Sequence, residues 1–258
     1  GCGGSVGAWW GARVGVGACG GTVVPLSTRS SSGEIGGGAA RVALRLLIVD
    51  RAHVHDHAGT LESLRLDQLF DPQAEPSDVQ AVPAPDGVAM LLFTSGTTRD
   101  ARIVRIGHRA LLRHTQTHAG TPGRPGVLGL GPDDVVLATL PLAHSFGIRM
   151  TALAPLAVGA RVEIEPDFDA SRSLARCRRA GVTWMAGVPT MFARWAEVEG
   201  PPWGTLKWAL SAGARLTADV RLRAERRLGA PVRSLIHISP RRRTCCCQFA
   251  SAALATGL

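Results

Sequence analysis

Tyrosine is absent from this sequence of 258 residues, and lysine occurs only once, at Lys207. Lysine and arginine together number 29 against 20 Asp and Glu, which gives a formal net charge of +9, and arginine carries almost all of the basic charge. Few aromatic residues accompany these arginines, so the pattern that stacks the bases of a single strand is missing. We therefore expect no nucleic-acid partner, and we attribute the local basic charge to an anionic small-molecule substrate.

Paired cysteines and long hydrophobic runs are also missing. The six cysteines include no CxxC pair, and three of them are consecutive, which suits neither an ordinary disulfide nor a tetrahedral zinc site. No apolar run approaches the ~20 residues that span a bilayer, so we expect no transmembrane segment. A reducing, cytoplasmic location is the default for such a chain. The first residues have neither an initiating Met nor a basic start, so we expect them to lie inside a longer protein rather than in a signal peptide.

Three histidines alternate in the sequence, at His53, His55 and His57. This spacing would place all three on one face of an extended segment, where they could bind a metal. Nothing else in the sequence supports an extended segment there, and a solvated loop explains the same residues. We prefer the loop and predict no metal ligands.

The most informative stretch runs from residue 88 to residue 104. An apolar run, Val88–Phe93, is long enough for a buried strand, and Ile103 with Val104 predicts a return strand. Between them stand small hydroxyl residues around one glycine, followed by a basic segment: Thr94, Ser95, Gly96, Thr97 and Thr98, then residues 99–102. Hydroxyls and backbone N–H groups can surround an anion, and glycine lets the backbone approach it closely. The stretch predicts a phosphate-binding loop, although GxxxxGK[ST] followed by a helix is absent.

From residue 132 onward, predicted strands and helices alternate, and Thr217 and Gly229 are suited to begin and end the last helix. This order predicts an α/β fold with a doubly wound, mostly parallel sheet and flanking helices. In such sheets, ligands bind beyond the carboxyl ends of the strands. Segments of small residues follow three predicted strands, at 141–147, 187–190 and 211–216. We expect these segments to converge with the phosphate-binding loop on one site.

A polar, proline-rich stretch at 71–86 is the best candidate for a linker. It separates an upstream part, residues 1–87, from a core region, residues 88–233. In the upstream part, three glycines at 36–38 would weaken a helix that starts within 30–35. The remaining residues, 234–258, contain Arg and Cys runs, and SLIHIS at 234–239 resembles a translated sequencing adapter. We therefore expect residues 234–258 to be non-native or disordered.

Four motifs, in order, resemble those of the adenylate-forming (AMP-binding) superfamily, which includes acyl-CoA synthetases, aryl-CoA ligases and peptide-synthetase adenylation domains. FTSGTT at 93–98 resembles the signature loop of the family, and LPLAHSFG at 140–147 resembles its second core motif. GVPTMF at 187–192 is similar to its acyl-pocket segment, and SAGARL at 211–216 is similar to its adenine-side turn. The resemblance implies an incomplete large N-terminal domain of an enzyme like the acyl-CoA synthetases and fatty-acid–CoA ligases.

The resemblance also implies a two-step reaction. A carboxylate attacks the α-phosphorus of Mg-ATP, which gives an acyl-adenylate and pyrophosphate, and a thiol, usually that of coenzyme A, then displaces AMP. ATP, Mg2+ and coenzyme A are thus implied, with a small carboxylic acid as substrate. The matching residues take these implied roles: Thr94, Ser95, Gly96, Thr97, Thr98 and Arg102 hold the β- and γ-phosphates, His144 acts beside the acyl carboxylate, Gly213 and Ala214 lie near the adenine, and Gly187, Val188 and Met191 line the acyl pocket.

The sequence departs from the family pattern in two respects. Residues 99–102, Arg-Asp-Ala-Arg, stand where the family loop continues with Gly, any residue, Pro and Lys. The Tyr-containing turn, the magnesium-binding Glu, the ribose-binding Asp and the C-terminal domain with its catalytic Lys are absent from the sequence. We therefore expect a fragment, inactive by itself, of an acyl-CoA synthetase. The alternatives are an adenylation domain that loads a carrier protein and a non-catalytic nucleotide-binding protein.

Overall fold

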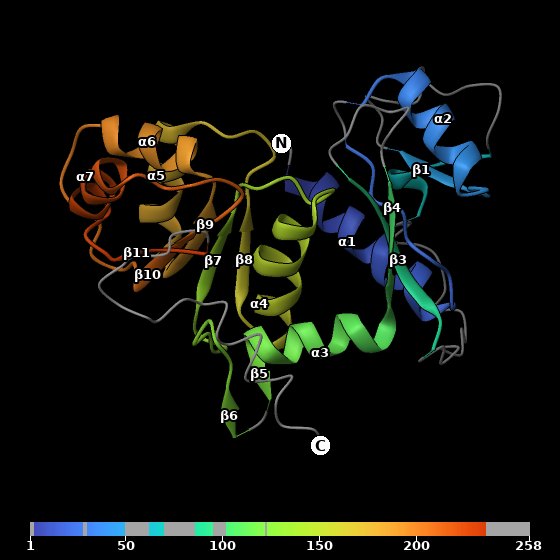
Figure 1. The fold of residues 1–258 in the computed structure, drawn as a ribbon, viewed down its shortest axis with the longest axis horizontal. Helices are drawn as coiled ribbons and strands as arrows, with labels where there is room; N and C mark the ends of the chain where they lie inside the picture. The colour runs from blue at the N-terminus through green and yellow to red at the C-terminus, as the bar shows by residue number, and fades with distance from the viewer. Residues whose placement is uncertain are drawn as a thin grey trace. The chain divides into compact units, whose positions relative to one another are not determined.

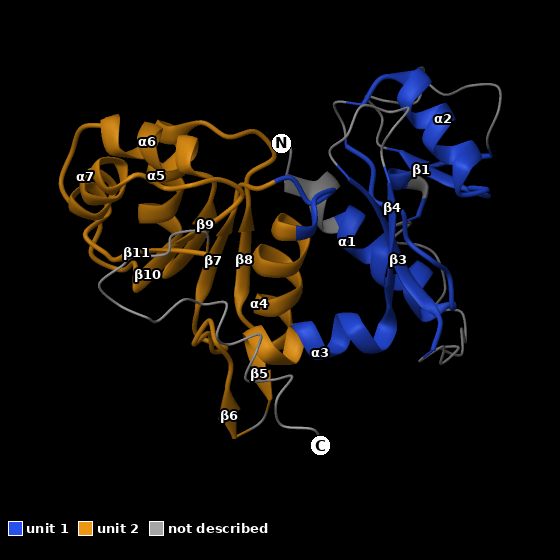
Figure 2. Ribbon diagram, in the orientation of Figure 1, with its two compact units in different colours: residues 1–114, 141–145 blue, residues 115–140, 146–258 orange. Residues whose placement is uncertain are grey.

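A computed structural model describes residues 3–27, 30–49, 62–69, 86–94, 102–121 and 123–235 of the chain. The chain divides into two compact units (Figure 2). Unit 1 comprises residues 1–114 and 141–145, and unit 2 comprises residues 115–140 and 146–258. The histidines at 53–57 and the residues beyond 235 lie outside the described part of the chain. No helix in the described part is long and apolar enough to cross a membrane.

Unit 1 combines helices with short paired strands (Figure 1). Its elements are α1 (Gly3–Ala18), α2 (Ser32–Arg41), β1 (Leu47–Val49), β2 (Ser63–Arg65), the 3-10 helix η2 (Leu66–Gln68), β3 (Val88–Phe93) and β4 (Ile103–Gly107). β1 pairs with β2 in parallel, and β3 pairs with β4 antiparallel, which confirms the predicted return strand. Val23 lies along the other edge of β3, where its N–H donates to the carbonyl of Ala89 at 3.1 Å and its own carbonyl accepts from Leu91 N–H at 2.9 Å.

Helix α2 continues through the three glycines that lower its helix propensity. A capping box begins the helix: Glu34 N–H donates to Ser31 Oγ at 3.3 Å, and Ser31 N–H donates to Glu34 Oε2 at 2.8 Å. Ile35 is buried, which adds tertiary packing. A Cβ added at Gly38 would stand 3.3 Å from Phe93 Cζ, so this glycine lets α2 approach β3 closely. Capping and packing therefore offset the cost of the glycines.

The core of unit 2 is a sheet of five parallel strands in the order β11-β10-β9-β7-β8. The strands are β7 (Val135–Ala138), β8 (Arg161–Ile164), β9 (Trp184–Gly187), β10 (Trp208–Ser211) and β11 (Val232–Ser234). The chain enters at β7, adds β8 on one side, and then adds β9, β10 and β11 on the other. The winding thus changes direction at β7, which confirms the doubly wound sheet that the alternation predicted.

Helices cover both faces of this sheet. α5 (Ala170–Ala180), α6 (Pro189–Glu197) and α7 (Ala218–Leu228) lie together on one side, and the π-helix η3 (Gly147–Leu153) continues into α4 (Ala154–Ala157) on the other (Figure 1). Trp184, Trp195 and Phe192 are among the largest fully buried side chains of the hydrophobic core. The remaining elements connect the sequence of unit 1 to the sheet: α3 (His108–Ala119), β5 (Gly120–Thr121) and β6 (Arg124–Pro125).

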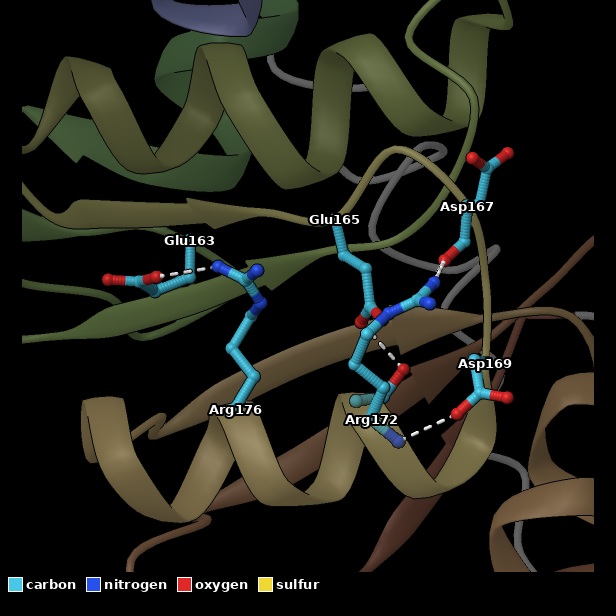
Figure 3. Close-up of polar contacts among 7 residues, drawn as sticks. Glu163, Glu165, Asp167, Asp169, Arg172 and Arg176 are labelled. Carbon is cyan, nitrogen blue, oxygen red and sulfur yellow. Dashed lines mark hydrogen bonds and ion pairs between the residues drawn. The ribbon is translucent and has the colours of Figure 1, made fainter. Parts of the chain in front are cut away.

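Acidic and basic side chains bind the end of β8 to the start of α5 (Figure 3). Glu165 follows β8, and its side chain is only 1% exposed. Arg172 Nε donates to Glu165 Oε1 at 2.8 Å, and Ser173 Oγ donates to Glu165 Oε2 at 2.7 Å. Asp169 caps the helix by accepting from Arg172 N–H at 2.7 Å. The hydrogen bond to Glu165 raises the pKa of Arg172. This connection therefore contains an ion pair between a buried carboxylate and an exposed guanidinium.

Candidate active site

The structure describes the two ends of the predicted phosphate-binding loop. Thr94 N–H donates to the carbonyl of Arg102 at 2.9 Å, and Arg102 N–H donates to Thr94 Oγ1 at 2.9 Å. This reciprocal pair continues the β3–β4 hairpin by one step and closes it around residues 95–101. Thr94 and Arg102 are both exposed. Ser95, Gly96, Thr97 and Thr98 lie outside the described residues.

His144 is exposed and lies in a turn directly before a helix. Its N–H donates to the carbonyl of Pro141 at 3.1 Å, which closes the turn after β7. The helix that follows includes seven residues of π-helix, Gly147–Leu153, in which Thr151 Oγ1 donates to the carbonyl of Gly147 at 2.7 Å. π-helical turns recur at functional sites. No feature of the sequence pointed to this geometry, because Gly, Ile, Met and Ala here are equally compatible with an ordinary α-helix.

Gly187 ends β9, and its backbone is tied to the next strand. Its carbonyl accepts from Ala212 N–H at 3.1 Å, and Gly187 pairs with Ser211 in the register of β9 and β10. A Cβ added at Gly187 would stand 2.9 Å from Trp195 Cζ3 and 3.3 Å from Phe192 Cε2. Gly187 therefore lets α6 lie directly against the end of the strand. The structure thus gives this predicted pocket residue a packing role.

Val188 and Gly213 bring the turns after β9 and β10 into contact. Gly213 has φ +87°, and a Cβ added there would stand 3.2 Å from Val188 Cγ1. Val188 is half-buried and extended, and it precedes α6, whose first residue is Pro189. Gly213 and Ala214 are exposed. Two of the four predicted segments, 187–190 and 211–216, therefore meet at the carboxyl ends of adjacent strands, as expected for ligand-binding turns in a doubly wound sheet.

Met191 belongs to the hydrophobic core. It is 7% exposed, and its N–H donates to the carbonyl of Val188 at 2.9 Å in the first turn of α6. The core around it includes Phe192 and Trp195. Among the predicted acyl-pocket residues, Val188 presents more surface than Met191 or Gly187.

The one buried cysteine of the described residues is not suited to act as a nucleophile. Cys177 is buried, and burial raises the pKa of its thiol, with a smaller contribution from Glu165. A buried thiol of this kind is a poor nucleophile. Within the described ranges, no group of three or more His, Cys, Asp or Glu side chains is placed to hold a metal ion.

A family model matches most of the chain. The family model described as "AMP-binding enzyme" matches residues 6–237. The chain belongs to the AMP-binding enzyme family. The match includes every residue predicted for the site, which supports the family resemblance of the four motifs.

Several curated members of this family are similar in sequence. Sulfoacetate–CoA ligase from Cupriavidus necator is 35% identical over 155 residues, which is 58% of this chain and 28% of that protein. 4-Coumarate–CoA ligase 1 from Oryza sativa subsp. japonica is 27% identical over 226 residues, which is 80% of this chain and 40% of that protein. The chain therefore spans less than half the length of these two relatives.

Solved structures of AMP-binding enzymes share the fold. Benzoate CoA ligase from Burkholderia xenovorans superposes with a TM-score of 0.75 at 20% identity, over 86% of this chain and 47% of that one. O-succinylbenzoate coenzyme A synthetase from Bacillus subtilis, in complex with ATP and magnesium, gives a TM-score of 0.73 at 24% identity, over 86% of this chain and 45% of that one. At these identities the likeness establishes the fold.

Proposed function

We propose that the protein containing this chain activates a carboxylic acid with ATP as an acyl-adenylate and transfers the acyl group to coenzyme A. The proposal is supported by the hairpin end at Thr94 and Arg102, because their two reciprocal hydrogen bonds hold the ends of a loop rich in hydroxyl residues. It is also supported by membership of the AMP-binding family and by relatives whose names are those of acid–CoA ligases.

The chemical problem in such a reaction is electrostatic, because a carboxylate anion must approach a polyphosphate. Positive charge and N–H donors near the β- and γ-phosphates lower this repulsion and fix the two reactants in position. We assign the loop 94–98 and Arg102 to these phosphates. Arg102 supplies a charge and a planar set of donors where the family pattern has Lys, so the contact geometry differs while the charge is kept.

His144 is assigned to the acyl carboxylate and the adenylate, and Gly213 with Ala214 to the adenine. The exposed backbone at Gly213 and Ala214 presents peptide groups to a planar base without side-chain obstruction. Gly187, Val188 and Met191 are assigned to the acyl side. Magnesium is expected with ATP, and the described residues contain no cluster of three or more His, Cys, Asp or Glu side chains that would hold it without the phosphates.

The deciding experiment is acid-dependent exchange of pyrophosphate into ATP by the whole protein, tested with a panel of short, branched, fatty and aromatic acids. Exchange with at least one acid is the expected result. A second assay follows release of AMP with coenzyme A or with a phosphopantetheinyl carrier protein as acceptor. If pyrophosphate exchange occurs but the acyl group is transferred only to the carrier protein, the protein is a carrier-loading adenylation domain and not an acyl-CoA synthetase. Nucleotide binding without exchange by any acid would make the protein a non-catalytic nucleotide binder.

Single variants test the residue assignments. Arg102→Met is expected to raise the KM for ATP about tenfold or more through loss of one charge-assisted contact. Arg105→Met is the matched control, because Arg105 is exposed on the same strand, β4, outside the loop. His144→Ala is expected to lower kcat with little change in the KM for ATP. Equal effects of Arg102→Met and Arg105→Met on the KM for ATP would contradict the phosphate assignment.

A further inference from the structure

The register of β7 and β8 places Thr139 beside Glu165. The paired residues run from Val135 with Arg161 to Ala138 with Ile164, and Glu165 N–H donates to the carbonyl of Ala138 at 2.9 Å. The parallel ladder therefore continues past both strand ends, and the next pair in register is Thr139 with Glu165. Paired residues in a parallel sheet point to the same face.

That face is the one covered by α5. Arg172 and Ser173 on α5 hold Glu165, and Arg176 on α5 lies 3.5 Å from Glu163, two residues earlier on β8 (Figure 3). Alternation along β7 places Thr139 on the same face, two residues after Leu137. Thr139 and Glu165 are thus neighbours beneath one helix.

Their hydrogen-bonding capacities are complementary and incompletely used. Thr139 is 5% exposed, and its Oγ1 has no hydrogen-bond partner in the described structure. The carboxylate of Glu165 accepts one hydrogen bond on each oxygen from Arg172 and Ser173, whereas a carboxylate can accept about four. A buried hydroxyl left without a partner costs about 1–3 kcal/mol. This cost is avoided if the donor and the acceptor are linked.

We propose that one buried water molecule links Thr139 Oγ1 to the carboxylate of Glu165 at the carboxyl ends of β7 and β8. The water accepts from the threonine hydroxyl and donates to a carboxylate oxygen, which satisfies both groups. A cation is disfavoured at this position because Arg172 already neutralises Glu165 at 2.8 Å. The ligand class is therefore a small neutral molecule that both donates and accepts hydrogen bonds.

The bridge has a positioning role in the fold. Thr139 is the first residue after β7, and the chain continues from it through Leu140 to the turn that carries His144. Anchoring Thr139 to Glu165, and through Glu165 to α5, fixes the point from which this turn leaves the sheet. The role is distinct from catalysis, because neither residue is assigned to a substrate.

A high-resolution crystal structure of the whole protein tests the bridge directly. The expected result is ordered density within about 2.6–3.2 Å of both Thr139 Oγ1 and a Glu165 oxygen. Thr139→Val keeps the side-chain shape and removes the hydroxyl, so it should abolish this density and lower the unfolding midpoint by about 2–4 °C. Thr139→Ser keeps the hydroxyl and should retain the density.

Ser211→Ala is the matched control for the thermal measurement. Ser211 is also fully buried with an unpartnered hydroxyl at a carboxyl strand end, but its row neighbours are Gly187 on β9 and Ser234 on β11, neither of which is a carboxylate. Its removal should leave the unfolding midpoint unchanged or raise it. A direct hydrogen bond between Thr139 and Glu165 without density between them would overturn the proposal. An unfolding midpoint that stays the same or rises in Thr139→Val would also overturn it.

Discussion

Lys207, the only lysine of the chain, lies with its Nζ 2.7 Å from Oδ1 of Asp134, a carboxylate whose side chain is 2% exposed. Thr183 Oγ1 donates to the same oxygen at 2.5 Å, and Gly131 N–H donates to Oδ2 at 2.9 Å. Asp134, Thr183 and Lys207 are the residues immediately before β7, β9 and β10. One buried carboxylate thus ties together the amino ends of three adjacent strands, opposite the end that carries the candidate site.

Removing the lysine charge should destabilise the sheet. Lys207→Met leaves Asp134 buried with two hydrogen bonds and no counter-charge, and we expect a loss of about 1–2 kcal/mol of unfolding free energy, since Lys207 is partly exposed. Urea denaturation of the purified protein measures the loss. Arg223→Met is the control, because its ion pair with Asp219 lies on the surface of α7 and should change stability by less than about 0.5 kcal/mol. Equal losses of unfolding free energy in the two variants would contradict a stabilising role for the ion pair between Lys207 and Asp134.

The same carboxylate predicts a pH dependence. Burial alone would raise the pKa of Asp134, but hydrogen bonds from Lys207, Thr183 and Gly131 outweigh it and lower the pKa below the ordinary value of 3.8. Because the folded-state pKa is the lower one, the stabilisation is present above the unfolded-state pKa. It is lost as the pH falls through the folded-state pKa. Urea midpoints should therefore converge for wild type and Asp134→Asn as the pH is lowered below about 4, and a constant difference down to pH 2 would refute this assignment.

Local patterns predicted most of the sheet and its helices. Val88–Phe93 is a strand as predicted, Thr217 caps α7, and Gly229 ends it with φ +69°. These features depend on residues close together in sequence, so composition and spacing suffice to find them. The ion pair between Asp134 and Lys207 joins residues far apart in sequence. Neither residue stands in a local pattern that predicts the contact.

The strand-end positions of the predicted site segments could be found to a similar extent. Motif spacing placed Gly187 and Gly213 at strand ends, and the contact between Val188 and Gly213 follows from the parallel pairing of β9 with β10. The sequence could not show that Gly187 is required by the ring of Trp195, since that contact depends on how α6 packs. The burial of Glu165 beneath Arg172 was likewise not predicted, because charged residues at alternating positions usually indicate a solvated surface.

Arg227 should not be replaceable by lysine. Its guanidinium donates to the carbonyls of Val198, Glu199 and Pro201, which follow the last turn of α6, and the residue is 9% exposed. An ammonium group cannot span three carbonyls with the fixed geometry of a guanidinium. Arg227→Lys should therefore cost about 1–3 kcal/mol of unfolding free energy, close to the cost of Arg227→Met. The exposed neighbour Arg226 provides the control, because Arg226→Lys should be within about 0.5 kcal/mol of wild type. Full stability of Arg227→Lys would show that charge alone suffices.

A double-mutant cycle separates the two reasons for glycine at position 213. Gly213→Ala places a methyl group 3.2 Å from Val188 Cγ1 and also forces a non-glycine residue into φ +87°. The backbone strain alone costs about 1–3 kcal/mol, and the contact with Val188 adds to it. Val188→Ala removes the contacting methyl groups but leaves the backbone unchanged. Combining the two substitutions should therefore recover part of the loss, with a coupling energy of about 0.5–1 kcal/mol in urea denaturation. If the two losses of unfolding free energy are strictly additive, the whole cost of Gly213→Ala comes from the backbone strain. If Val188→Ala restores the full stability lost in Gly213→Ala, the cost comes from the contact between the two turns.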